Sequence, residues 1–361
     1  MIFGTLGRYI GARFGKTILA VFAGFFALIY LVDFVELLRR SGDIEGASSA
    51  LVALLSLLRT PAVTEQLLPF SVLFGAMVAL LNLSRKLELV VARASGVSAW
   101  QFLAPPIAFA FLLGAFSIFV YNPVSAALKQ RADRIETRLF GRGGSAPADT
   151  SMWIRQKSVE GASILRAERS ADSGQTLGAV IAFVYDSSGR FIERVEAPEA
   201  TLGPGLWTFK SARILAPGNE PRDVPRYGLK TNLHPDQVAQ AFVPPETVSF
   251  WALKNLAERT RAAGLDATGY ELRLQVLMAR PLFLVAMVMI AASFSLRFFR
   301  MGGVAKNVLS GVAAGFVLYV ATKLASDLGG AGLVSLPFAA WSPAIAGAMF
   351  GTLSILTQED G

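Results

Sequence analysis

Long apolar runs occupy both ends of this chain, and a polar, strand-like stretch from 123 to 272 separates them. A helix needs roughly 20 apolar residues to cross the hydrocarbon core of a bilayer. Six runs reach that length, three before the stretch and three after it: 17–38, 62–83, 101–122, 274–297, 304–325 and 335–357. The pattern therefore predicts a membrane protein with transmembrane helices in 1–122 and 273–361 and one inserted, water-facing domain in 123–272.

The inserted stretch has the alternation that is typical of β-strands. Trp207 and Phe209 alternate with Thr208 and Lys210, as in a strand with one buried face. Turn signals rich in glycine, proline and serine separate the runs that we predict as strands: 151–156, 163–169, 177–186, 190–202, 206–215 and 226–233. Several short strands with regular turns predict an all-β, jelly-roll-like domain, followed by an amphipathic helix over 249–263.

A shorter apolar run, residues 47–60, follows the first span. It is too short to cross a bilayer, so we expect a separate helix that lies at the membrane interface or packs back on the bundle. Pro61 is expected to end it, because proline lacks a backbone donor and restricts the residue before it.

Residues 84–96, after the second span, predict a short amphipathic helix. Four apolar residues recur at i, i+3, i+4 and i+7 and so share one face: Leu87, Val90, Val91 and Ala94. Ser84 fits its N-cap and Gly96 the position after its C-terminus. The helix either lies at the interface with its basic residues on lipid phosphates, or docks into another subunit and transmits its motion. In the second case Glu88 is the charged anchor, as the single acid among Arg85, Lys86 and Arg93.

Composition supports the membrane assignment and limits the chemistry. Hydrophobic residues make up 53% of the 361 residues and charged residues 17%, which is few for a soluble domain of this length. The net charge of +8 fits contact with anionic lipid better than nucleic-acid binding. Without cysteine, and with His234 as the single histidine, the chain holds no thiol chemistry and no multi-histidine metal site. No catalytic motif is present, so we expect a non-enzymatic chain without a cofactor of its own.

Basic residues in the short loops predict the orientation. They gather in three segments that six spans place on one side together with the C-terminus: Arg8, Arg13 and Lys16; Arg85, Lys86 and Arg93; Arg297, Arg300 and Lys306. That side is expected to be cytoplasmic, which puts the insert outside the inner membrane. Arg39 and Arg40, at the outer end of the first span, oppose this trend.

The charges around Arg39 and Arg40 have two interpretations. Glu36 and Arg40 are four residues apart with the acid first, the favourable order for a helical ion pair. The charges either snorkel and pair locally, or hold the phosphates of an anionic lipid; we favour the lipid slightly. Other basic residues fall at a similar depth: Lys129, Arg131, Arg134 and Lys323. Lys323 also has Asp327 four residues on, so a simple ion pair remains open there.

Four runs of residues resemble the lipopolysaccharide export permeases of the LptF/LptG family, with the first-span run more similar to its LptG branch. They are FVELLRRSG (34–42), LNLSRKLELVVARASGVSAWQ (81–101), ARPLFLVAMVMIAASFSLRF (279–298) and AAWSPAIAGAMFGT (339–352). The resemblance covers nearly the whole chain and includes the position of the insert. It implies a six-span permease with a jelly-roll-like periplasmic domain.

The resemblance also implies partners. Family members pair as LptF with LptG on a dimer of the ATPase LptB, which alone uses ATP. They extract lipopolysaccharide from the outer leaflet of the inner membrane and pass it through the periplasmic domains to LptC and LptA.

The resemblance further implies site residues. By position in the motif, Glu88 matches the acid that meets LptB, with Arg85, Lys86 and Arg93 around it. Arg39 and Arg40 match the lipid-phosphate residues, and we count Glu36 beside them among the expected lipopolysaccharide-binding residues. Lys129, Arg131, Arg134 and Lys323 correspond more loosely. Asp33 departs from the family pattern, in which that position is often basic.

Two other classes of function are weighed against this one. A membrane-anchored periplasmic binding or scaffold protein would not need the amphipathic cytoplasmic helix. A secondary transporter would need titratable residues near the midplane of the membrane, whereas the charges considered above lie near the ends of the spans.

Overall fold

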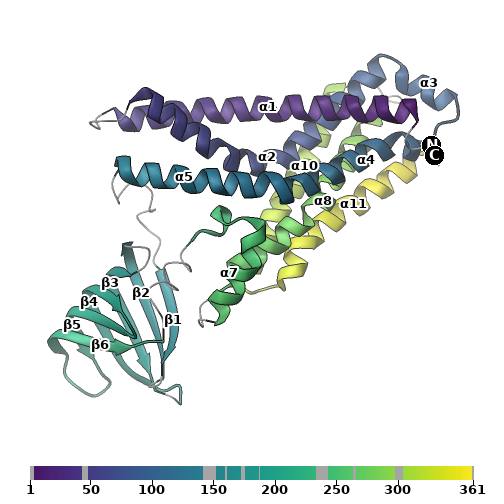
Figure 1. Cartoon of the computed structure of the whole chain (residues 1–361). Coiled ribbons are helices and arrows are strands. Elements are labelled where there is room, and N and C mark those ends of the chain that lie inside the picture. Colours follow the sequence, from purple (N-terminus) through teal and green to yellow (C-terminus); the bar gives the residue numbers. More distant parts are fainter. Residues whose placement is uncertain are drawn as a thin grey trace. The chain divides into compact units, whose positions relative to one another are not determined.

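The computed structural model describes residues 4–42, 48–140, 152–158, 161–171, 175–186, 188–232, 243–262, 266–296 and 304–359 (Figure 1). The chain forms two compact units. The first combines Met1–Asp133 with Leu272–Gly361, and the second is Arg134–Glu271. The predicted boundaries of the insert, 123 and 272, therefore bracket the second unit, which begins inside a helix rather than at its start.

The helical elements are α1 (Thr5–Ser41), α2 (Ser49–Arg85), α3 (Glu88–Ala94), α4 (Ala99–Phe116), η1 (Ser117–Tyr121), α5 (Asn122–Phe140), α7 (Phe250–Ala262), α8 (Thr268–Leu296), α10 (Val304–Gly330) and α11 (Leu336–Glu359). The segments α4, η1 and α5 run on as one long helix. Among the described residues, six helices are long and apolar enough to cross a membrane, which confirms the predicted three-plus-three pattern.

α2 and α8 form the centre of the bundle, and α1 and α10 lie at its surface. Side chains such as Leu73 and Met287 are fully buried, while Val32 on α1 and Val317 on α10 remain more than 60% exposed. Small residues allow the close helix contacts that are typical of membrane bundles. A Cβ atom at Gly75 would lie only 2.6 Å from the Cα of Ile18, so α1 packs directly on the backbone of α2.

The apolar run before Pro61 is not a separate helix. α2 (Ser49–Arg85) continues through it, so the prediction that Pro61 ends a short helix was wrong. The hydroxyls of Thr60 and Thr64 each donate to the carbonyl four residues earlier, at 2.8 and 3.0 Å. The carbonyl of Pro61 itself accepts from the hydroxyl of Thr64 at 3.1 Å and from Tyr121 of the third span at 3.0 Å. Inside a bundle, such neighbours satisfy backbone groups that a proline would leave exposed.

The predicted helix over 84–96 is divided in two. Ser84 does not cap it, because α2 extends through this buried residue to Arg85. Leu87 then adopts a left-handed conformation (φ 59°) that turns the chain, and α3 (Glu88–Ala94) follows. Gly96, with φ 83°, lies just past the end of α3, as predicted.

The described part of the second unit contains one antiparallel sheet of six strands: β1 (Met152–Ser158), β2 (Gly161–Ala171), β3 (Thr176–Tyr185), β4 (Phe191–Gly203), β5 (Leu206–Leu215) and β6 (Arg222–Lys230). The inserted all-β domain is confirmed, and β6 begins four residues before the predicted start. Strands adjacent in the chain are adjacent in the sheet. This is the order of a meander, and the described strands do not by themselves establish the connectivity of a jelly roll.

The sheet coils around a buried core. Gln156 of β1 accepts hydrogen bonds from Trp207 of β5 at 3.1 Å and from Thr231, just past β6, at 2.6 Å. In a flat sheet β1 and β5 would be about 19 Å apart, because each strand adds about 4.8 Å. The two edges of the sheet therefore curve toward each other over fully buried side chains such as Leu165 and Phe209.

A polar turn connects β3 to β4. Asp186 accepts from the hydroxyl of Ser188 at 2.6 Å and from the backbone N–H of Arg190 at 2.9 Å. These bonds hold the pKa of Asp186 well below its usual range.

After the sheet, the helix α7 (Phe250–Ala262) matches the helix predicted over 249–263.

Candidate functional site

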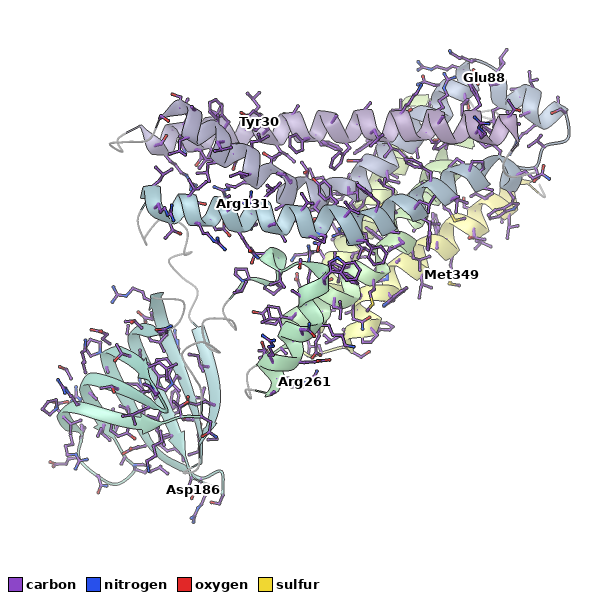
Figure 2. All side chains as sticks on the ribbon, in the orientation of Figure 1. Tyr30, Glu88, Arg131, Asp186, Arg261 and Met349 are labelled. Carbon is purple, nitrogen blue, oxygen red and sulfur yellow. The ribbon has the colours of Figure 1, made fainter. Side chains whose placement is uncertain are left out.

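The candidate coupling residue, Glu88, is the first residue of α3 and lies against α1 (Figure 2). Arg13 of α1 donates to its carboxylate at 3.2 Å, and Tyr9 does so at 3.3 Å. Arg13 also donates to the Tyr9 hydroxyl at 2.5 Å, so the three side chains form a closed triangle. Glu88 is therefore tied to the first span, a link that the sequence pattern did not indicate.

The apolar stripe of α3 faces outward. Leu87 is 61% exposed and Val91 66%, whereas Leu89 on the opposite side is buried. The other predicted coupling residues, Arg85, Lys86 and Arg93, are exposed around the stripe. α3 thus packs on the bundle through one side and presents an apolar surface with a basic border on the other.

At the far end of α1, Glu36 binds both neighbouring arginines. Arg40 Nε donates to its carboxylate at 2.7 Å and Arg39 Nη2 at 3.1 Å. Both guanidinium groups remain more than half exposed, at 54% for Arg40 and 78% for Arg39. We call Arg39 and Arg40 the basic rim. The local ion pair was one of the two interpretations of these charges, and it is present.

Asp33, which departs from the family pattern, has a basic neighbour on another helix. Arg59 of α2 places its Nε 3.8 Å from the carboxylate of Asp33. Sequence reasoning missed Arg59, because it falls in the run taken for a separate helix.

The other predicted basic residues lie on two further helices. Lys129 is half-buried on α5, and Arg131 is exposed on the same helix (Figure 2). Arg134 is exposed in the second unit. Lys323 on α10 pairs with Asp327 at 3.2 Å, with both side chains exposed, so the simple ion pair foreseen there is present.

A buried polar cluster joins three helices inside the bundle. Glu65 of α2, only 3% exposed, accepts from Arg280 of α8 at 2.5 Å and has Arg273 of α8 at 3.5 Å. It also accepts from Asn122 of α5 at 3.0 Å and from Ser125 at 2.6 Å. Arg280 donates in addition to the hydroxyl of Ser117 in η1 at 2.9 Å. We call these six residues the Glu65 cluster.

Sequence reasoning missed this cluster, although it carried a signal. Glu65 is the sole charged residue of the predicted span 62–83, and Arg280 lies within 274–297. Charges of opposite sign inside two spans indicate a buried pair, because an unpaired charge in a bilayer is costly. Glu65 is the fourth residue of 62–83 and Arg280 the seventh of 274–297, so both lie in the first third of their predicted spans rather than at the centre. Glu65 and Arg280 form an ion pair, and both side chains are buried.

His234 and the loop residues Arg297 and Arg300 lie outside the described part of the chain. The candidate residues that are described are suited to binding and to positioning helices. The exposed apolar stripe can contact a protein, the exposed guanidinium groups can bind anions, and the buried charges fix helices relative to one another.

Comparison with known proteins supports this picture. A sequence model of the family described as lipopolysaccharide export system permease LptF/LptG matches residues 8–357. The chain is similar to the lipopolysaccharide export system permease protein LptG of Escherichia coli, with 25% identity over 333 residues, covering 90% of this chain and 91% of that protein. It is also similar to the LptG protein of Haemophilus influenzae, with 23% identity over 326 residues and 89% of each chain covered.

The family match spans both the helical unit and the inserted sheet, and the six helices that could cross a membrane agree with a multi-pass permease. The chain therefore belongs to the LptF/LptG family of lipopolysaccharide export system permeases.

Proposed function

We propose that this chain is the LptG-type permease subunit of an ATP-driven exporter that extracts lipopolysaccharide from the outer leaflet of the inner membrane. The observation that carries the proposal is the family match over residues 8–357, with relatives named LptG. The chain's termini and α3 face the cytoplasm, and the inserted sheet faces the periplasm, in line with the basic short loops.

The apolar stripe of α3 is the docking surface for an LptB-type ATPase dimer. An exposed apolar surface with a charged border is typical of a protein-contact site. Arg85, Lys86 and Arg93, beside the stripe, belong to the same contact with the ATPase. When ATP binding closes the ATPase dimer, its movement pushes α3. The contact between Glu88 and Arg13 passes this movement to α1.

The lipid is held between this chain and an LptF-type permease. α1 and α10 expose apolar side chains such as Leu31 and Phe316, which suit the acyl chains or the partner's helices. The basic rim, Arg39 and Arg40, binds lipid phosphates, with Lys129, Arg131, Arg134 and Lys323 as further candidates. The space between the two permeases then narrows, and this pushes the lipid toward the periplasm.

The inserted sheet receives the lipid and passes it to LptC and then LptA. The support for this step is the family match, which covers the sheet as well as the helices.

Co-purification tests the coupling part of this proposal. We expect an LptB-type ATPase to co-purify with the wild-type chain, and Glu88→Lys to weaken its retention or its ATP-driven lipid release. Val91→Asp should weaken retention as well, because it puts a charge on the apolar stripe, whereas the matched Val91→Ile should not. Val91 is exposed, so neither Val91 variant should change thermal unfolding. Wild-type retention and release in both Glu88→Lys and Val91→Asp would contradict the assignment of α3.

A further inference from the structure

The Glu65 cluster occupies a special position along the chain. α5 leads into the inserted domain and α8 leads out of it, and both helices bind the same carboxylate of α2. α2 continues from Glu65 to Arg85, immediately before the turn that leads to α3. About 30 Å of helix, which includes Pro69, therefore separates the cluster from the cytoplasmic helix.

The third span is distorted so that it reaches the cluster. Ser117 and Asn122 are five residues apart, and both contact the cluster. In an α-helix, side chains five residues apart point about 140° away from each other. The π-helical turn η1 (Ser117–Tyr121) widens the helix so that residues five apart lie on one side. Such π turns often occur at functional sites.

Stability alone is a weak explanation for the cluster. A buried ion pair usually stabilises a fold no better than apolar side chains of similar volume, because both charges lose their hydration. Its hydrogen bonds, however, have direction, and here they fix three helices relative to one carboxylate. Glu65 and Arg280 are among the few buried charged residues in the described part of the bundle.

We propose that the Glu65 cluster is a positioning clamp that holds α5 and α8 together, so that movement of α2 reaches both helices flanking the inserted domain at once. α2 thereby links α3 to the insert by a route separate from the contact between Arg13 and Glu88. The clamp deepens the proposed export function and rests on it only for the transport measurement described below.

Spin-label distances test the clamp directly. The chain has no cysteine, so Val124→Cys on α5 and Met278→Cys on α8, both exposed, give a single labelled pair. Distances between the labels are measured in the full-length chain in nanodiscs, together with thermal unfolding. Three variants are compared: Glu65→Gln, Glu65→Leu with Arg280→Met, and Asn122→Ala. Lys210→Gln with Glu199→Gln, which removes an exposed ion pair of the sheet, is the matched control.

We expect Glu65→Gln to lower the unfolding temperature, because Arg280 is left buried without its counter-charge. The double variant Glu65→Leu with Arg280→Met should regain the unfolding temperature and yet broaden the distance distribution. Asn122→Ala, which keeps the ion pair, should broaden it as well. In the complete complex, both should lower the lipid released per ATP roughly three- to tenfold. The control should match the wild type in every measurement.

A wild-type distance distribution in Asn122→Ala, or wild-type distance and release in the folded double variant, would overturn the clamp. The distance measurement needs no transport. If the wild-type complex releases no lipopolysaccharide, the export proposal fails, while the distances still decide on the clamp.

Discussion

At the residue scale, Glu36 competes for the groups that the lipid needs. Its carboxylate binds both guanidinium groups of the basic rim, at 2.7 and 3.1 Å. A lipid phosphate therefore has to replace or share these bonds. All three side chains are well exposed, so the local pairs are weak and exchange is easy.

Removing that competitor should strengthen lipid binding. We expect Glu36→Gln to raise lipopolysaccharide capture roughly two- to fivefold, because the amide loses its charge and leaves Arg39 and Arg40 to the phosphate. Capture is measured with the purified complex at low salt. Asp223→Asn, at an exposed acid of the sheet, is the control and should have no effect. Lower capture in Glu36→Gln would mean that Glu36 itself supports the lipid.

The contact between Arg13 and Glu88 leads to a second expectation. Arg13→Gln should leave ATPase retention intact, because the stripe of α3 is untouched, yet reduce the lipid released per ATP severalfold. The ratio is measured in proteoliposomes that hold the complete complex, with Arg8→Gln as the control. An unchanged ratio in Arg13→Gln would remove α1 from the coupling route.

At the element scale, the membrane spans and strands could be predicted because their apolar periods are long and regular. β3, β4 and β5 lie within one residue of their predicted ends. The continuation of α2 through Pro61 could not be predicted from local sequence, since the hydroxyl of Tyr121, which contacts Thr64 and the carbonyl of Pro61, comes from another helix. The turn at Leu87 was missed as well, because a left-handed leucine has no local sequence signal.

A buried amide, Gln156, links the two edges of the coiled sheet. Gln156→Leu keeps the volume but removes the acceptor of the buried Trp207 indole N–H, at roughly 1–3 kcal/mol, and also removes the bond from Thr231. We expect hydrogen exchange of the β1 and β5 amides in the full-length chain to rise at least about tenfold. Trp207→Phe removes one donor and keeps the ring, so its effect should be smaller. Unchanged exchange in Gln156→Leu would contradict this account of the sheet.

At the scale of the whole molecule, the sequence indicated which residues occupy the two surfaces and which of them pair along one helix, but not which contacts they make between helices. Glu88 stood out as the single acid among basic residues of an amphipathic helix, and Arg39 and Arg40 because they oppose the charge trend of the short loops. The pair of Glu36 with Arg40 followed from their spacing on one helix. Arg13, the partner of Glu88, and the Glu65 cluster depend instead on how segments distant in sequence pack. Sequence periodicity reports which face of a helix is apolar, but not which helix lies against it.

The account places a lipid-binding rim at one end of α1 and a coupling contact at the other, about 39 Å apart along a single helix. One measurement tests this claim most directly. A photoreactive amino acid at Val35, an exposed residue beside the rim, is cross-linked to lipopolysaccharide in the complete complex. The account predicts a strong cross-link that ATP diminishes and that Arg39→Glu with Arg40→Glu lowers by about tenfold or more. Arg190→Glu with Arg213→Glu, an equal change of charge on the sheet, should leave it intact. Equal cross-linking in the rim variant and the wild type would contradict the account.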